Sequence, residues 1–199
     1  MGNYVKANVA KPEGMPGRGI TPKDQIFVID VDDIDTFPAR DAAGVVITED
    51  IVMKESKVAV GIYLTPGSAT LTSNSEGDPD AEGFRPSVQF SHPGNKQEVR
   101  EFKANWLGKN CVVIIRYCNG DKSDIIGSPC NPAKMAVEYT GNNEANANSF
   151  TFQQVSKGDD IGIYKGALTT SDGVVDGEPN NGSGTTSTVF NTFIGGPAA

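Results

Sequence analysis

The sequence CVVIIRYC, residues 111–118, is the feature that most constrains how this chain can fold. A strand with one face in water alternates apolar and polar residues, whereas this run is almost continuously apolar. Such a run is typical of a strand whose two faces are both covered by protein. We therefore expect a β-structure in which this segment is a central strand.

Other segments rich in Val, Ile, Tyr and Thr predict further strands around it. They are residues 25–31, 43–53, 57–73, 86–91, 133–141, 148–156 and 161–166. In the segment 148–156, Phe150 and Phe152 alternate with polar residues, so we expect both rings to face the core. The sequence SPCNP, residues 128–132, contains two prolines and predicts a rigid corner.

Residues 95–108 are the one stretch in which the apolar period changes to that of a helix. Asn95 and Glu98 have the spacing of a capping box, and Gly108 is a helix-ending signal. The stripe at helical spacing consists of Val99, Phe102, Trp106 and Leu107. We expect this stripe to pack on a sheet.

The 199 residues favour a single domain with a segment at either end. Residues 1–24, with three prolines and several glycines, predict an extended arm, and residues 25–168 the β-body. Residues 169–199 are rich in Gly, Ser, Thr and Asn and predict a flexible tail. The expected fold is mainly β: two packed antiparallel sheets, a β-sandwich or partial barrel, with one α-helix and extended N- and C-terminal arms.

Charge is divided unevenly between the arm and the rest of the chain. Residues 1–23 hold four basic residues and one acidic residue, a charge of +3; the whole chain carries −8, so the remainder carries −11. An acidic body repels nucleic acid, so we expect no binding to a phosphate backbone. A basic arm can attach to the acidic body of another copy; the alternative is a disordered segment with incidental lysines.

Apolar residues within the two end segments are the candidates for assembly contacts. They are Tyr4, Val5, Met15 and Ile20 in the N-terminal arm and Phe190 and Phe193 in the C-terminal tail. A short apolar segment on a soft tether often docks on another surface.

The sequence DPDAEG, residues 78–83, resembles part of an EF-hand calcium loop. Asp78, Asp80 and Glu82 alternate and Gly83 takes the sixth position, but Gln89 stands where a bidentate Glu is needed. The flanking segments also predict strands, whereas an EF-hand needs helices. We therefore expect an acidic hairpin tip with no metal.

Four carboxylates and the single histidine are the remaining candidates for chemistry. The carboxylates, which could hold a cation or form an acid–base pair, are Asp30, Asp32, Asp33 and Asp35. We expect them to be a solvated strand end that discourages edge pairing. His92 precedes the predicted helix, where an exposed turn residue is expected, and no second histidine exists for a zinc pair.

Three cysteines, Cys111, Cys118 and Cys130, leave one unpaired in any disulfide scheme. Cys111 and Cys118 are seven residues apart and would point to opposite faces of one strand. We expect three buried, unreactive thiols. These patterns together predict no enzyme activity and no cofactor. The chain has no apolar run long enough for a membrane span and no secretory leader at its start, so we expect a cytoplasmic origin.

The order of elements over about residues 25–168, carried by the segment from SVQFSHPGNKQEVREFKANWLGK to NSFTFQQ, resembles the tail tube (major tail) proteins of long-tailed bacteriophages. The resemblance implies two packed sheets and one helix, hexameric rings, and rings stacked into a tube that conducts DNA without specific binding. It also implies a virion protein, assembled in the host cytoplasm with other virion proteins and without a membrane. The Gly/Ser/Asn-rich tail after Thr169 departs from the family pattern.

Two other classes also fit a β-rich chain with arms. A capsid decoration protein would bind the head lattice instead of forming rings. A metal-assisted carbohydrate-binding or adhesion β-sandwich would need the loop at residues 78–83 or the Asp30 cluster to bind a cation. Rings or tubes in electron micrographs would favour the first reading.

Overall fold

Strands β1 (Pro22–Asp30) and β8 (Cys111–Tyr117) form the central pair of the fold in the computed structural model, which describes residues 8–14, 17–118 and 123–175. They run antiparallel, in register from Ile26 opposite Ile115 to Asp30 opposite Cys111. The predicted strand with two covered faces is confirmed: five of the seven residues of β8, Cys111 to Ile115, are buried in succession.

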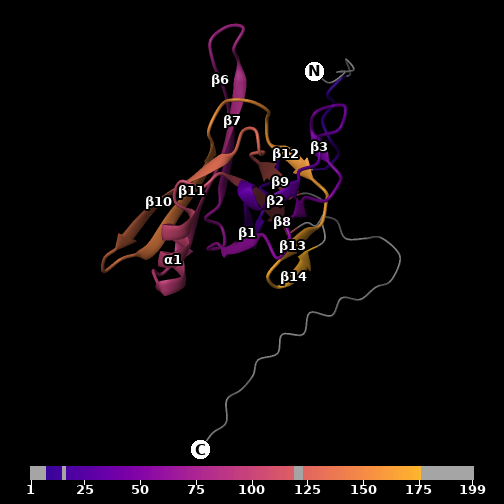
Figure 1. The fold of residues 1–199 in the computed structure, drawn as a ribbon. Helices are drawn as coiled ribbons and strands as arrows, with labels where there is room; N and C mark the ends of the chain where they lie inside the picture. Colours follow the sequence, from indigo (N-terminus) through magenta and orange to yellow (C-terminus); the bar gives the residue numbers. More distant parts are fainter. Residues whose placement is uncertain (1–7, 15–16, 119–122, 176–199) are drawn as a thin grey trace, which may run out of the picture.

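The other described elements surround this pair (Figure 1). The strands are β2 (Ile34–Thr36), β3 (Val46–Ile47), β4 (Val52–Met53), β5 (Val60–Tyr63), β6 (Thr70–Glu76), β7 (Gly83–Pro93), β9 (Ser123–Ile126), β10 (Ala133–Gly141), β11 (Asn146–Gln154), β12 (Gly162–Tyr164), β13 (Leu168–Thr170) and β14 (Gly173–Val175). The helices are the α-helix α1 (Gln97–Trp106) and the short 3-10 helix η1 (Val31–Asp33).

Two layers of strands pack face to face. One has the order β3-β12-β9-β8-β1-β5 and the other the order β10-β11-β7-β6. A single residue pair, Ala133 with Cys111, joins β10 to β8. All pairings between strands are antiparallel except that of β3 with β12. The expected mainly-β fold with packed antiparallel sheets and one α-helix is thereby confirmed for the described residues.

The corner that sends the chain from one layer to the other lies between β9 and β10. Gly127 has φ +84°, and a Cβ there would lie 2.9 Å from both Ala133 N and Cys111 O. Ser128 and Asn131 exchange backbone hydrogen bonds of 3.0 and 3.2 Å across the turn. The rigid corner expected from SPCNP is therefore present, and a glycine is required directly before it, at residue 127.

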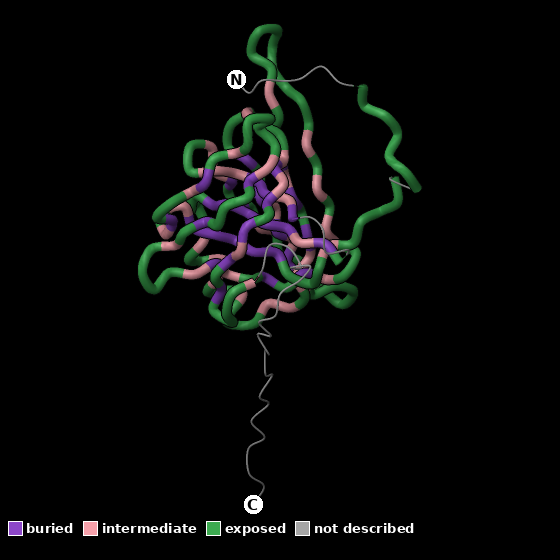
Figure 2. Tube along the Cα trace, turned by 90° about the vertical axis from the view of Figure 1, so that its right-hand side faces the viewer, coloured by how far each residue is buried: buried purple, intermediate pink, exposed green. Residues whose placement is uncertain are grey.

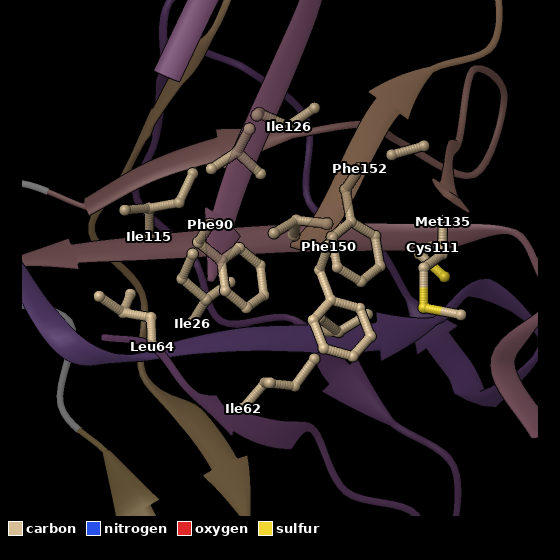
Figure 3. Close-up of a cluster of buried hydrophobic side chains, with 14 of the residues drawn as sticks. Ile26, Ile62, Leu64, Phe90, Cys111, Ile115, Ile126, Met135, Phe150 and Phe152 are labelled. Atoms are coloured by element: carbon tan, nitrogen blue, oxygen red, sulfur yellow. The ribbon is translucent and has the colours of Figure 1, made fainter. Parts of the chain in front are cut away.

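The first hydrophobic cluster fills the space between the two layers (Figure 3). Ile26 and Val28 of β1 meet Phe90 of β7 and the two phenylalanines of β11 there. Phe90 stacks with both rings, at centroid separations of 5.6 Å from Phe150 and 6.2 Å from Phe152. The inward alternation predicted for these two phenylalanines is confirmed.

The second cluster lies on the opposite face of the central pair. Phe27 and Ile29 of β1 and Val112 and Ile114 of β8 point into it. The pairs β2–β4 and β13–β14, the strands β3, β9 and β12, and the loop residues Ile51 and Ala59 supply other side chains of this cluster. Figure 2 shows the buried residues, in purple, gathered in the interior of the body with exposed residues around them.

Tyr164 anchors the loops over this second cluster. Its hydroxyl accepts a hydrogen bond of 3.1 Å from Ile51 N and donates one of 2.7 Å to Ala167 O. Burial of the ring raises the pKa of Tyr164 to about 12.

The segment 43–53, predicted as one strand, contributes two short strands, β3 and β4.

The beginning of α1 differs from the prediction. Lys96 is the N-cap residue and makes no side-chain capping bond. The Asn95 side chain instead accepts a hydrogen bond of 2.8 Å from Lys103 Nζ, so no capping box forms. The end is as expected: Gly108, at φ +83°, follows the last residues of the helix.

The apolar stripe of α1 packs on the first cluster without being fully buried. Val99, Phe102 and Trp106 all contact it while remaining partly exposed. Leu107 is 67% exposed, so its predicted place in the stripe is wrong. The helix ends at Trp106, and Leu107, the residue that follows it, already has an extended backbone conformation.

The folded body begins and ends a few residues away from the boundaries predicted from the sequence. Strand β1 starts at Pro22, before the predicted start at residue 25. The β13–β14 hairpin crosses the predicted boundary at residue 168, and Thr170 in it is buried. The folded part therefore continues to Val175, the last described residue.

We expect Phe152→Ala to lower the free energy of unfolding by about 3–5 kcal/mol, because its ring is completely buried. Trp106→Ala should cost about 2 kcal/mol or less, because part of its ring already contacts water. Urea unfolding of both variants measures the difference. Equal losses would contradict the half-covered position of α1.

Candidate assembly surfaces

The segment before β1 is exposed along its described length. Residues 8–14 and 17–21 make no helix or strand and stand apart from the body (Figure 2). Val9 is 97% and Ile20 is 60% exposed. The arm joins the body through Cys118 N, which donates a hydrogen bond of 3.0 Å to Thr21 O. The aliphatic side chains of Val9 and Ile20 are therefore exposed to solvent.

Ile20 is the one assembly candidate from the sequence that the structure describes. The other five, which lie outside the described residues, are Tyr4, Val5, Met15, Phe190 and Phe193.

The β6–β7 hairpin projects from the body at the top of Figure 1. Its strands pair from Thr70 opposite Gln89 to Glu76 opposite Gly83. The tip, residues 77–82, is exposed and contains Asp80 at φ +70°. The hairpin with a long acidic tip expected from the sequence is present. Within the described ranges, no group of three His, Cys, Asp or Glu residues is arranged to hold a metal ion.

A hollow of about 230 Å³ lies between β5 and α1. Its walls are mostly apolar and include Ile62, Val99, Phe102 and Phe150. Phe102 meets Phe150 edge-on and stacks on Trp106 at 5.2 Å between ring centroids. Val99 and Phe102 of the predicted helical stripe thus form one wall of this hollow.

His92 borders the same hollow and is not the turn residue that the sequence predicted. It lies within β7, because that strand continues to Pro93. Its Nδ1 is 2.8 Å from Tyr63 O, and its ring meets those of Tyr63 and Phe150 edge-on. The side chain thus links β7 to the edge of β5.

The carboxylates that follow β1 are only partly the solvated group that was expected. Asp32 and Asp35 are exposed, but Asp30 is 5% exposed and forms an ion pair with Lys109. Its Oδ1 also accepts a hydrogen bond of 3.1 Å from Asp32 N. The bond to Asp30 raises the pKa of Lys109 above its ordinary value. The ion pair of Asp30 with Lys109 therefore lies at the end of the β1–β8 pair, where Asp30 is opposite Cys111.

The expectation of three buried thiols is wrong for two of them. Cys111 is buried, and burial raises its pKa to about 12. Cys118 and Cys130 are exposed. Cys118 follows the last residue of β8 and Cys130 lies in the corner, so neither is covered by a layer of the fold.

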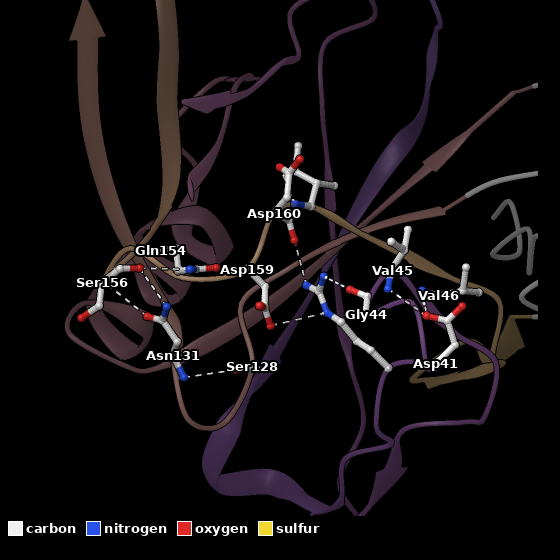
Figure 4. Close-up of polar contacts among 12 residues, drawn as sticks. Asp41, Gly44, Val45, Val46, Ser128, Asn131, Gln154, Ser156, Asp159 and Asp160 are labelled. Carbon is white, nitrogen blue, oxygen red and sulfur yellow. Dashed lines mark hydrogen bonds and ion pairs between the residues drawn. The ribbon is translucent and has the colours of Figure 1, made fainter. Parts of the chain in front are cut away.

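Arg40 links the loop before β3 to the loop before β12 (Figure 4). Its guanidinium donates hydrogen bonds of 3.0 Å to Gly44 O and 2.8 Å to Asp160 O, and lies 4.0 Å from the Asp159 carboxylate. Nearby, the backbone amides of Val45 and Val46 donate to Asp41 and lower its pKa.

Asn131 makes a second link in the same region. Its side-chain amide donates a hydrogen bond of 2.8 Å to Ser156 O and accepts one of 3.0 Å from Ser156 N. Sequence reasoning singled out neither Arg40 nor Asn131, because partners at distant positions leave no local pattern. Their bonds are satisfied within the body and fix loops in place.

Comparisons with protein-family models, with curated proteins and with solved structures give no match. In the part of the chain that the structure describes, no helix has both the length and the apolar character needed to cross a membrane.

We expect Lys109→Met to lower the free energy of unfolding by about 2–3 kcal/mol, because it leaves the buried Asp30 carboxylate without its cation. The control is Lys57→Met, which removes the 2.9 Å pair with Asp33 near the surface and should cost under about 1 kcal/mol. Thermal or urea unfolding compares them. Equal costs would show that Asp30 is hydrated after all.

Two thiols of the native protein should react rapidly with an aromatic disulfide reagent at pH 8. Cys118 and Cys130 are exposed, whereas burial and the raised pKa keep Cys111 as an inaccessible thiol. The third thiol, Cys111, should react only when the protein is unfolded in urea. Rapid reaction of all three thiols in the native protein would be inconsistent with the buried strand β8.

Proposed function

We propose that this chain is a structural subunit of a bacteriophage virion that assembles with itself into hexameric rings, stacked as a tail tube that conducts DNA. The observation that carries the proposal is the arm before β1, in which Val9 and Ile20 are held in water at the edge of a completed fold. Burying aliphatic surface of this kind is favourable, at about 25 cal/mol per Å². A neighbouring copy offers such a surface.

The arrangement of the body supports the same proposal. Two layers of antiparallel strands with one α-helix are the arrangement that the resemblance to tail tube proteins implies. The strands β6 and β3 stand at ends of the layers within the described residues. Strand edges of this kind present backbone groups to which another copy can pair.

The charge of the chain fits a conduit for DNA. The residues after the arm carry −11, which repels phosphates, so DNA would pass without specific contacts. The +3 arm adds an attraction between copies, but salt screens it within about 8 Å at physiological ionic strength. The apolar contacts of the arm must therefore supply most of the binding. Assembly would take place in the host cytoplasm, with other virion proteins as further partners and no membrane.

Removing the arm should separate assembly from folding. We expect the chain lacking residues 1–20 to keep its melting temperature at low concentration but to form no rings or tubes in electron micrographs. The same loss is expected of the variant Val9→Asp/Ile20→Asp. Both aliphatic side chains are exposed, so the substitutions leave the body unchanged.

The matched control is Val155→Asp/Val174→Asp, which alters two exposed valines of the body, 45% and 66% exposed. It should assemble like the parent chain. Rings that form equally well without the arm would contradict the proposal that the arm drives assembly. A parent chain that stays monodisperse but binds a capsid lattice would identify a decoration protein instead.

A further inference from the structure

Strand β5 has one exposed edge, and a glycine, Gly61, lies within this strand. Among the described residues, β5 pairs with β1 alone. One end of its other edge is held by the hydrogen bond of 2.9 Å from Ala59 N to Thr169 O, and the other end by the contact of His92 with Tyr63 O. Gly61 lies between these two ends. Glycine within a strand often marks a place where another backbone approaches closely.

A hollow lies on each side of this edge. The hollow beside α1, of about 230 Å³, and a second hollow of about 160 Å³ both include Val60 and Gly61 in their walls. The walls of the second one also include Phe27 and Val175, together with polar side chains at Gln25, Thr170 and Asp172. A cavity of about 150 Å³ lined by apolar side chains holds a benzene ring. Each hollow is therefore large enough for one aromatic side chain.

The chain leaves the described structure at the second hollow. Val175 lines that hollow, and 24 residues follow it. Their large apolar residues are confined to VFNTFI, residues 189–194, which contains no charged residue. The 13 residues between, 176–188, are mostly Gly, Ser, Thr and Asn. A flexible linker of that length spans roughly 20 Å on average, so the segment reaches β5 of its own chain easily.

The spacing of the two phenylalanines matches the two hollows. Phe190 and Phe193 are an odd number of residues apart, so in an extended segment they point to opposite faces. A strand lying along the β5 edge has one hollow on each face. Either direction of the segment therefore directs one ring to each hollow.

We propose that residues 189–194 bind to the β5 edge of the same chain, crossing it at Gly61, with Phe190 in one hollow and Phe193 in the other. The tether makes this contact intramolecular, with an effective concentration in the millimolar range. The contact covers Val99 and Phe102 of α1, which are partly exposed in the wall of the first hollow. It does not depend on the assembly proposed above.

Amide hydrogen exchange at Gly61, followed by NMR on dilute protein, tests the contact. We expect Phe190→Ser/Phe193→Ser to speed exchange at Gly61 at least about tenfold while leaving Val113 in the core unchanged. Asn180→Ser/Asn181→Ser, a control in the linker, should change neither. Equal exchange at Gly61 in the parent and the phenylalanine variant would overturn the proposal. So would protection that disappears on dilution, which would assign the segment to a second copy.

A variant of β5 tests the crossing point. A Cβ at Gly61 would lie 3.4 Å from the Phe27 ring, an ordinary contact, so Gly61→Val should fold while blocking the edge. The single tryptophan reports the result, because Trp106 stacks on Phe102, and Phe102 lines the first hollow. We expect the fluorescence emission of Trp106 to shift to the red in Gly61→Val, and to shift in the same way in Phe190→Ser/Phe193→Ser. Unchanged emission in a folded Gly61→Val variant would overturn the crossing at Gly61.

Discussion

The burial of the β1–β8 pair on both faces is the constraint on which the rest of this structure depends. Alternate residues of each strand enter different clusters, so two apolar surfaces must be covered at once. The β10-β11-β7-β6 layer covers one surface. Short strands and loops anchored by Tyr164 cover the other. The corner at Gly127 is one of the connections at which the chain passes from one layer to the other.

This division leaves the surface of the body uneven. The helix α1 covers the first cluster only in part, because Val99, Phe102 and Trp106 contact it from one side and remain partly exposed. Apolar surface therefore persists in the hollow beside β5 and in the arm before β1. Both proposals made above follow from these uncovered surfaces: one assigns the arm to a neighbouring copy, and the other assigns the hollow to the end of the same chain.

The sequence predicted those elements that local pattern determines. The continuous apolar run at residues 111–118 identified the central strand, and the alternation around Phe150 and Phe152 identified the face of β11. It failed where a distant partner decides the outcome. Asp30 was assigned to solvent because its cation, Lys109, lies 79 residues away in the sequence. His92 was assigned to a turn because β7 extends further than its own residues indicate, through pairing with β11.

The candidate site was less predictable than the fold. Apolar residues in the arm were recognised from composition, but the hollow beside β5 depends on where α1 lies relative to β5 in the folded chain. Gly61 carries no signal in the sequence that separates it from other strand glycines. Its position becomes meaningful once hollows on both faces of the β5 edge are known.

Hydrogen exchange read by mass spectrometry at low and high protein concentration tests most directly the claim that a self-sufficient body presents its arm to another copy. The account predicts that peptides from β1 and β8 exchange slowest and equally at both concentrations, since their burial is internal. Peptides covering residues 8–21 should exchange rapidly in dilute protein and become protected on assembly. An arm that exchanges at the same rate in both states, or a central pair that is protected only at high concentration, would contradict it.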